Sequence, residues 1–284
     1  MSEQKQLTPA QYVNQVAEVA QTQIKKFVDE QKLNLPQNYS AGNAIKQLQL
    51  KIQDDEKLLA CTQASLLKVM IDSAVLGLNI SKNQFYVIPY GNKAQVSISY
   101  LGKVAIAKRI DPTIDDIIGR PVKKGEEFDF EDLDNGYSKI IKHKRTLESM
   151  NTKEYIGGYA TILYNDGKEP KSLIMTYDRI KESWKMSTAK PIDNEGNVKA
   201  GTVHDKFADD MIVKTCISAI CKGIISKSDD RDLFTETVQT VELEERKVIS
   251  DIEAEENNGV GEYVDVNFKG IDSETGEVIE KVDF

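Results

Sequence analysis

Residues 85–100 decide the fold class of this chain, and they read Phe85-Tyr86-Val87-Ile88-Pro89-Tyr90-Gly91-Asn92-Lys93-Ala94-Gln95-Val96-Ser97-Ile98-Ser99-Tyr100. Strand-forming residues alternate with others on both sides of the Gly-Asn pair, and this pattern predicts a β-hairpin with a short turn. In the second predicted strand, Val96, Ile98 and Tyr100 share one face because side chains alternate along a strand.

The segments on either side of this hairpin predict helices and a second hairpin. Helical spacing of apolar residues predicts helices over residues 9–31, 101–109 and 207–226, and another that follows the N-cap candidate Thr62. Residues 157–164 and 172–177 flank Asn165-Asp166-Gly167-Lys168, which is typical of a hairpin, and Asp178 is expected to cap a short helix through Trp184. Together these elements predict an α+β protein whose antiparallel hairpins pack on helices.

Composition argues against several protein classes. The chain has 284 residues, of which 40% are hydrophobic, but it has no run of apolar residues long enough to span a bilayer, and its first residues are polar. We therefore expect a soluble protein without membrane association. Three cysteines without a CxxC pair and two histidines leave little for a disulfide framework or a zinc site. Phosphate-binding and nucleophile motifs are also missing from the sequence, so we expect no enzyme, no metal and no cofactor.

Charge is distributed unevenly along the chain. The net charge is -9, yet residues 240–284 contain 14 acidic and 4 basic residues, whereas residues 1–239 contain 32 acidic and 33 basic ones. Residues 73–110 contain no acidic residue and carry Lys82, Lys93, Lys103, Lys108 and Arg109. A basic stretch of this kind is typical of a polyanion-binding face, although it also suits an ordinary solvated surface. The acidic C-terminal residues predict a flexible tail.

Several motifs, in one order, resemble the RecT family of phage single-strand annealing recombinases. They are Leu76-Gly77-Leu78-Asn79, the segment 85–91, Ser99-Tyr100-Leu101-Gly102-Lys103 with Lys108-Arg109, Gly157-Gly158-Tyr159-Ala160, Trp184-Lys185-Met186-Ser187 and Met211-Ile212-Val213-Lys214-Thr215. The resemblance covers about residues 60–226. Many family members have a basic residue or two after the Lys214-Thr215 pair, where this chain has Ser218 and Ala219.

The resemblance implies a function in phage homologous recombination inside the bacterial cytoplasm. It implies binding of single-stranded DNA and of the annealed duplex, pairing of complementary strands without ATP, and assembly into a ring or helical filament. It also implies a separate phage exonuclease and a host single-stranded-DNA-binding protein as partners of the tail. On this basis residues 1–58 are expected to form a helical oligomerisation arm, residues 59–235 the DNA-binding and annealing core, and residues 236–284 an acidic linker with a partner-binding segment.

The candidate DNA-contacting residues combine this implication with local pattern. Basic side chains contact phosphates, and aromatic rings stack on bases, although hairpin aromatics are more often core residues. Lys214 and Lys222 fall on the exposed side of the helix predicted over 207–226. The full set is Lys103, Lys108, Arg109, Lys214, Lys222, Lys82, Lys93, Tyr86, Tyr100, Lys185, Lys190 and Lys206.

Two other functions are alternatives to annealing. A nuclease needs clustered carboxylates for metal ions, and the dense cluster here is Glu126, Glu127, Asp129, Glu131, Asp132 and Asp134, which we interpret as an exposed acidic loop. A second alternative is a non-enzymatic oligomeric adaptor or structural phage protein. Such a protein would recruit replication partners through the acidic tail.

Overall fold

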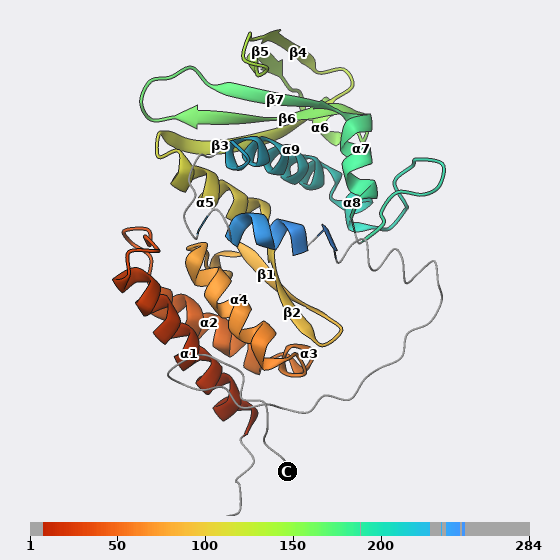
Figure 1. The fold of residues 1–284 in the computed structure, drawn as a ribbon. Coiled ribbons are helices and arrows are strands. Elements are labelled where there is room, and N and C mark those ends of the chain that lie inside the picture. Colours follow the sequence, from red (N-terminus) through yellow and green to blue (C-terminus); the bar gives the residue numbers. More distant parts are fainter. Residues whose placement is uncertain (1–7, 188, 228–233, 235–236, 245, 248–284) are drawn as a thin grey trace, which may run out of the picture. The chain divides into compact units, whose positions relative to one another are not determined.

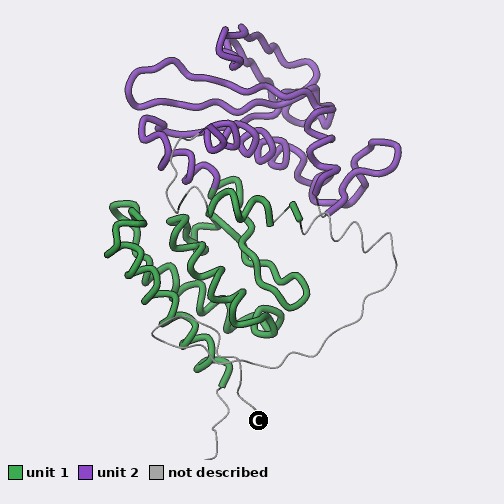
Figure 2. Tube along the Cα trace, in the orientation of Figure 1, with its two compact units in different colours: residues 1–102, 229–284 green, residues 103–228 purple. Residues whose placement is uncertain are grey.

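The chain divides into two compact units. The computed structural model describes residues 8–187, 189–227, 234, 237–244 and 246–247. Unit 1 comprises residues 1–102 and 229–284, and unit 2 comprises residues 103–228, as coloured in Figure 2. Both units contain helices and antiparallel strands, which confirms the predicted α+β class. The functional division at residues 58 and 235 stays a prediction, and the predicted flexible tail lies mostly outside the described residues.

Unit 1 begins with a small helical bundle. Its helices are α1 (Pro9–Asp29), α2 (Ala41–Gln53), α3 (Glu56–Leu59) and α4 (Gln63–Val75), followed by the 3-10 turn η1 (Ile80–Lys82). The predicted first helix is confirmed: Thr8 caps α1 through a reciprocal hydrogen-bond pair with Gln11, and Val13, Val16 and Ile24 are buried. Helix α1 packs on both α2 and α4, so its apolar face belongs to the core of this unit.

A two-stranded hairpin completes this unit. Strands β1 (Phe85–Tyr90) and β2 (Lys93–Ile98) pair antiparallel with Phe85 opposite Ile98, and the hairpin packs on α4. This confirms the predicted hairpin, whose turn contains Gly91 at a φ of 57°. The prediction that Tyr100 extends the second strand is wrong, because Tyr100 is the first residue of helix α5 (Tyr100–Ile110). The boundary between the two units falls within α5.

Unit 2 is built on a five-stranded antiparallel sheet. Its strands are β3 (Ile114–Lys123), β4 (Glu127–Asp132), β5 (Ser138–Lys144), β6 (Tyr155–Tyr164) and β7 (Lys171–Thr176), in the order β3-β6-β7-β5-β4 (Figure 1). The predicted second hairpin is confirmed as β6 and β7. Strand β5 joins β7 through one residue pair, Ser138 with Ser172.

Helix α9 (Ala208–Ile225) covers one face of this sheet, where it lies on β3, β6 and β7 (Figure 1). Helix α7 (Tyr177–Lys185) packs against β6, β7 and α9. The short helices of this unit are α6 (Leu147–Asn151) and α8 (Val203–Lys206), and α8 packs on α9. The close packing depends on Gly158, where an added Cβ would stand closer to the Ile212 side chain than real Cβ atoms come. The prediction that Asp178 caps the helix through Trp184 is wrong, because the Thr176 hydroxyl accepts the capping hydrogen bond from Arg179 N.

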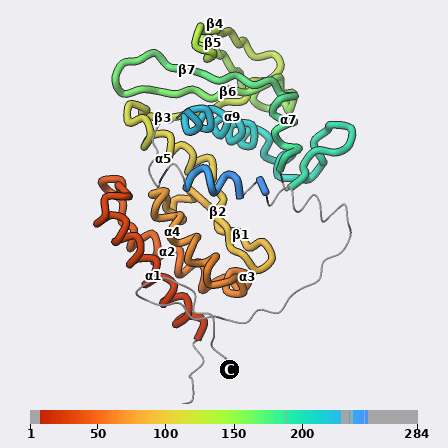
Figure 3. Tube along the Cα trace, in the orientation of Figure 1, coloured from red at the N-terminus to blue at the C-terminus, as the bar shows by residue number. Residues whose placement is uncertain are grey.

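The described C-terminal residues return to unit 1. Residues 237–244 are helical, and Phe234, Val238 and Val241 are buried (blue in Figure 3). Glu244 pairs with Lys68 of α4 at 3.2 Å, so the start of the acidic tail is held by the N-terminal helices. Among the described helices, none is long and apolar enough to cross a membrane.

Candidate nucleic-acid interface

Four candidate residues belong to unit 1 and surround its hairpin. Lys82 ends η1 and is exposed, Lys93 begins β2 and is exposed, and Tyr86 of β1 is 52% exposed. Tyr100 is half-buried at the start of α5. An exposed ring on a strand is available for contact with a ligand, and this distinguishes Tyr86 from the buried Phe85 at 1% exposure.

The start of α5 is fastened to the loop before β1. Ser99 Oγ accepts a hydrogen bond from Gly102 N at 3.2 Å and donates one to the Asn83 carbonyl oxygen at 2.6 Å. Ser99 N donates to the Gln84 carbonyl oxygen at 3.0 Å. Ser99 therefore caps the helix and joins it to the loop at the same time.

Three candidate cations lie further along α5, in unit 2. Lys103 is half-buried, Lys108 is exposed and Arg109 is half-buried. Burial raises the pKa of the Cys221 thiol to about 12, and the charge of Lys103 acts in the opposite direction, which places Lys103 near Cys221. Lys108 Nζ donates to the Asp115 carbonyl oxygen, and the last-turn position of Lys108 and Arg109 suits the negative end of the helix dipole.

Helix α9 presents two exposed lysines. Cys216, Ile217 and Ile220 are buried, whereas Lys214 and Lys222 are exposed, as expected from the helical wheel. The two lysines are separated by eight residues, or about 12 Å along the helix axis, and they lie within about 80° of each other around it. A pair of cations with this spacing can follow a sugar-phosphate backbone.

The remaining candidates are Lys185 at the end of α7, Lys206 at the end of α8, and Lys190 in the segment between these helices. Lys185 pairs with Glu182 at 2.6 Å, so its charge is partly neutralised. Lys206 is exposed on α8, and Lys190 is half-buried with a φ of 40°. Trp184 Nε1 donates to Thr215 Oγ1 at 2.8 Å, which joins α7 to α9. The centroids of the Trp184 and His204 rings are 4.8 Å apart, so α8 packs on α7 as well.

Burial lowers the pKa of His204, and the charge of Lys214 lowers it further. A depressed pKa favours the neutral imidazole, which is the form that packs against the Trp184 ring without a buried charge. His204 therefore supports the position of α8 beside α9 and adds no cation of its own to this surface.

Most of the acidic cluster forms a β-strand, so the prediction of an exposed loop is wrong. Residues 127–132 form β4, which pairs with the lysine-rich strand β5. Glu127 and Lys142 approach to 2.5 Å, and Lys139 pairs with Glu169 at 2.7 Å. Sequence reasoning did not single out the basic residues of β5, and the structure shows these two paired with acids. Within the described part of the chain, no group of three or more possible metal ligands is found.

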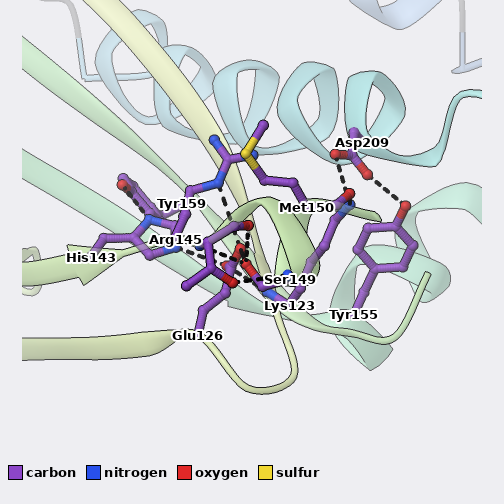
Figure 4. Close-up of polar contacts among 10 residues, drawn as sticks. Lys123, Glu126, His143, Arg145, Ser149, Met150, Tyr155, Tyr159 and Asp209 are labelled. Carbon is purple, nitrogen blue, oxygen red and sulfur yellow. Dashed lines mark hydrogen bonds and ion pairs between the residues drawn. The ribbon is translucent and has the colours of Figure 1, made fainter. Parts of the chain in front are cut away.

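Glu126 is the centre of a buried polar network (Figure 4). Its carboxylate accepts hydrogen bonds from Lys123 N at 2.9 Å and Ser149 Oγ at 3.0 Å, and it lies 2.9 Å from His143 Nε2. Arg145 Nε lies 3.5 Å away. Burial by itself raises the pKa of Glu126, but the hydrogen bonds from Lys123, His143 and Ser149 outweigh it, so this pKa is lowered. The carboxylate is thus ionised in the folded protein and joins three separate segments.

A second buried charge supports the first turn of α9. Lys123 is 3% exposed, and its ammonium pairs with Asp209 at 3.0 Å and donates to the Met150 carbonyl oxygen at 2.7 Å (Figure 4). Tyr155 donates from its hydroxyl to Asp209 at 2.5 Å, and burial together with this bond raises the pKa of Tyr155. Both networks hold the scaffold together, and their charges are occupied by partners within the protein.

Each of the two α+β units therefore displays exposed lysines among the candidate residues. The family model described as the RecT family matches residues 42–260, which is more than half of the chain and covers elements from α2 to α9. The chain therefore belongs to the RecT family, whose members anneal single-stranded DNA in phage recombination. A search of curated proteins found no match to this chain. The roles of individual candidate residues in DNA contact stay predictions.

Proposed function

We propose that this protein binds single-stranded DNA without sequence preference and anneals complementary strands without ATP, as an oligomeric ring or helical filament. The observation that carries the proposal is the family match, which extends across both units. The exposed lysines of α9 and of the hairpin region support it, because their side chains are available to phosphates.

Backbone contact explains how such a protein promotes pairing. Lysines bind phosphates as point charges and carry no sequence information, so base edges stay free to test a second strand. Watson-Crick pairing then supplies the specificity. Stacking in a duplex is worth about 1.4 kcal/mol per base-pair step, so annealing is downhill once strands are aligned and needs no nucleotide hydrolysis.

The acidic tail gives this function a means of recruitment. Residues 240–284 carry 14 acidic and 4 basic residues, and apolar residues are scattered among them. We propose that this segment binds the phage exonuclease or the host single-stranded-DNA-binding protein. Glu244 is held on α4, so a partner bound to the tail is recruited through unit 1.

Salt dependence tests the binding mode. If each subunit neutralises about 3 to 5 phosphates, log K should fall with log salt at a slope of about -2 to -3.5 on single-stranded DNA. Lys214→Ala and Lys222→Ala should each reduce the slope by about 0.7 and weaken binding to all sequences equally. Lys124→Ala removes the same charge from an exposed lysine paired with Glu154 and should leave the slope unchanged. A flat salt dependence of the native protein would overturn backbone binding.

Charge reversal separates annealing from an adaptor function. The double variant Lys108→Glu with Arg109→Glu should lose DNA binding while sedimentation still shows assembled protein, because phosphates are repelled. If assembly is lost together with DNA binding, the basic residues form contacts between subunits, and this result favours the hypothesis of an oligomeric adaptor.

A further inference from the structure

A compact hydrogen-bonded clamp joins two segments of unit 1 that are distant in the sequence. We define this clamp as Asn79, Asn83, Gln84, Ser99 and Gly102, which come from the loop before β1 and from the start of α5. It lies inside the stretch 73–110 that contains no acidic residue. The clamp has a loop side, a helix side and a close contact between them.

The loop side is held in one conformation. Asn79 Oδ1 accepts hydrogen bonds from Ser81 N at 2.9 Å and Ser81 Oγ at 2.8 Å, which caps η1. Asn79 N donates to Gln84 Oε1 at 2.8 Å, and Asn83 takes a left-handed conformation with a φ of 53°. Asparagine tolerates this conformation better than most residues, so the carbonyl oxygens of Asn83 and Gln84 are directed toward the helix.

The helix side supplies matching groups. Ser99 is only 9% exposed, and both its N–H and its hydroxyl donate to the loop, at 3.0 Å to Gln84 and at 2.6 Å to Asn83. The same hydroxyl accepts from Gly102 N at 3.2 Å. Both donors of this buried serine are thus used between the two segments, and its hydroxyl oxygen also accepts a bond within the helix side.

Gly102 permits the close approach. A Cβ added there would stand 2.9 Å from Ile98 Cγ2 and 3.0 Å from the Gln84 carbonyl carbon, and nearer still to the Gln84 carbonyl oxygen. Backbone atoms cannot swing aside as a flexible side chain does, so any larger residue must push the first turn of α5 away from the loop. Glycine is required here for space, because no unusual φ is involved.

Each of the two bonded segments carries a candidate DNA-contacting residue next to a clamp residue, and the two candidates are 18 positions apart in the sequence. Lys82 precedes Asn83, and Tyr100 follows Ser99. Within the described part of the chain, Lys82 forms no ion pair, and its side chain is exposed. A lysine can bind the phosphate of a nucleotide and a partly exposed ring can stack on its base, so an exposed Lys82 and a half-buried Tyr100 on two bonded segments suit contact with one strand.

We propose that Ser99 and Gly102 are positioning residues for DNA binding, which set the separation of Lys82 and Tyr100 for contact with one strand. This inference rests on the proposed function. If the Ser99 cap only stabilises α5, its removal should lower the melting temperature and leave the DNA contacts unchanged. If it positions Lys82 and Tyr100, its removal should also abolish one phosphate contact.

The test measures single-stranded DNA affinity against salt for the full chain and its variants. Ser99→Ala and Lys82→Ala should each lower the magnitude of the slope by about 0.7, and the double variant should bind no more weakly than Lys82→Ala. Ser99→Thr should restore the slope, because a threonine hydroxyl forms the same bonds. Gly102→Ala should resemble Ser99→Ala.

Helix α2 in the same unit provides matched controls. Ser40 Oγ accepts a capping hydrogen bond from Asn43 N at 3.3 Å, and a Cβ at Gly42 would meet no atom within 4 Å. Ser40→Ala and Gly42→Ala therefore remove a cap and a glycine of the same kinds and should leave affinity and slope unchanged.

Several outcomes would overturn the inference. The clamp is structural only if Ser99→Ala keeps the native slope of log K against log salt. The same conclusion follows if the double variant loses affinity by the product of the two single losses, because the two residues then act independently. If Ser99→Ala does not fold, Lys82→Ala and Tyr100→Leu decide: each should weaken binding, their effects should be coupled, and Tyr100→Phe should bind as the native protein does. Independent or absent effects contradict the inference. Failure of the native protein to bind single-stranded DNA would instead refute the proposed function.

Discussion

Replacement of Glu126 by glutamine tests whether the buried network holds unit 2 together. Glu126→Gln keeps the shape of the side chain but removes its charge and places an NH₂ group among donors. The Glu126 side chain is 0% exposed, and it now accepts from Lys123 N and Ser149 Oγ and contacts His143 Nε2 and Arg145 Nε. At least one buried donor loses its acceptor in the variant.

The magnitude follows from these contacts. A buried donor left without a partner costs about 1–3 kcal/mol, and breaking a buried charge pair costs about 3–5 kcal/mol. Because glutamine retains one acceptor oxygen, we expect a loss of about 3 kcal/mol in the free energy of unfolding of unit 2. With a urea dependence of about 2 kcal/mol per molar, the midpoint should fall by about 1.5 M.

Trp184 makes this loss measurable in the full chain. It is the single tryptophan, it is 3% exposed, and it belongs to unit 2, so its fluorescence reports unfolding of that unit. Glu127→Gln is the matched control, since the Glu127 side chain is 56% exposed and pairs with Lys142 on the surface. Equal urea midpoints for the Glu126 and Glu127 variants would refute the reasoning.

The same network predicts a pH dependence with a defined sign. The pKa of Glu126 is lower in the folded protein than its ordinary value of about 4.3, so the folded state binds the proton less readily than the unfolded state. The contribution is fully present above the unfolded pKa and is lost as the pH falls through the folded pKa. Between about pH 6 and pH 3, the native protein should therefore lose more stability than Glu126→Gln does.

Two further predictions concern packing and thiol reactivity in unit 2. Gly158→Ala should lower the free energy of unfolding by about 1–3 kcal/mol in urea titrations, because the added methyl overlaps Ile212; an unchanged midpoint would mean that α9 adjusts freely on the sheet. Burial raises the pKa of Cys216 and of Cys221 to about 12, so both thiols should resist a thiol reagent at pH 8 until urea unfolds the unit, and rapid labelling of the native protein would contradict their burial.

Elements with strong periodicity were predictable from the sequence. The hairpins of β1 with β2 and of β6 with β7 combine strand-forming residues with a Gly-containing turn, and helices α1 and α9 show apolar residues at a period of about 3.6. Strand β4 was missed although Phe128 and Phe130 alternate with acids, because the acidic content suggested a solvated loop. Its Phe128 ring stacks on Tyr159 at 5.5 Å, a contact with a residue 31 positions away that no local pattern reveals.

The candidate site was predictable only in part for the same reason. Exposure of Lys214 and Lys222 follows from the apolar side of one helix. The bonds from Ser99 to Asn83 and Gln84 instead join residues 16 and 15 positions apart, and Ser99 falls where a strand pattern passes into a helix pattern. Burial of Glu126 likewise depends on His143 and on tertiary packing, which a count of acids cannot show.

The most direct measurement of the central claim is the rate of annealing of two complementary labelled oligonucleotides with purified full-length protein, in the absence of ATP and of metal ions. We predict faster pairing than in the protein-free reaction and retention of a protein-DNA complex, with no acceleration for a non-complementary pair. Binding without acceleration would contradict annealing and leave a single-strand-binding protein, and absence of any binding would contradict both DNA binding and annealing by this protein.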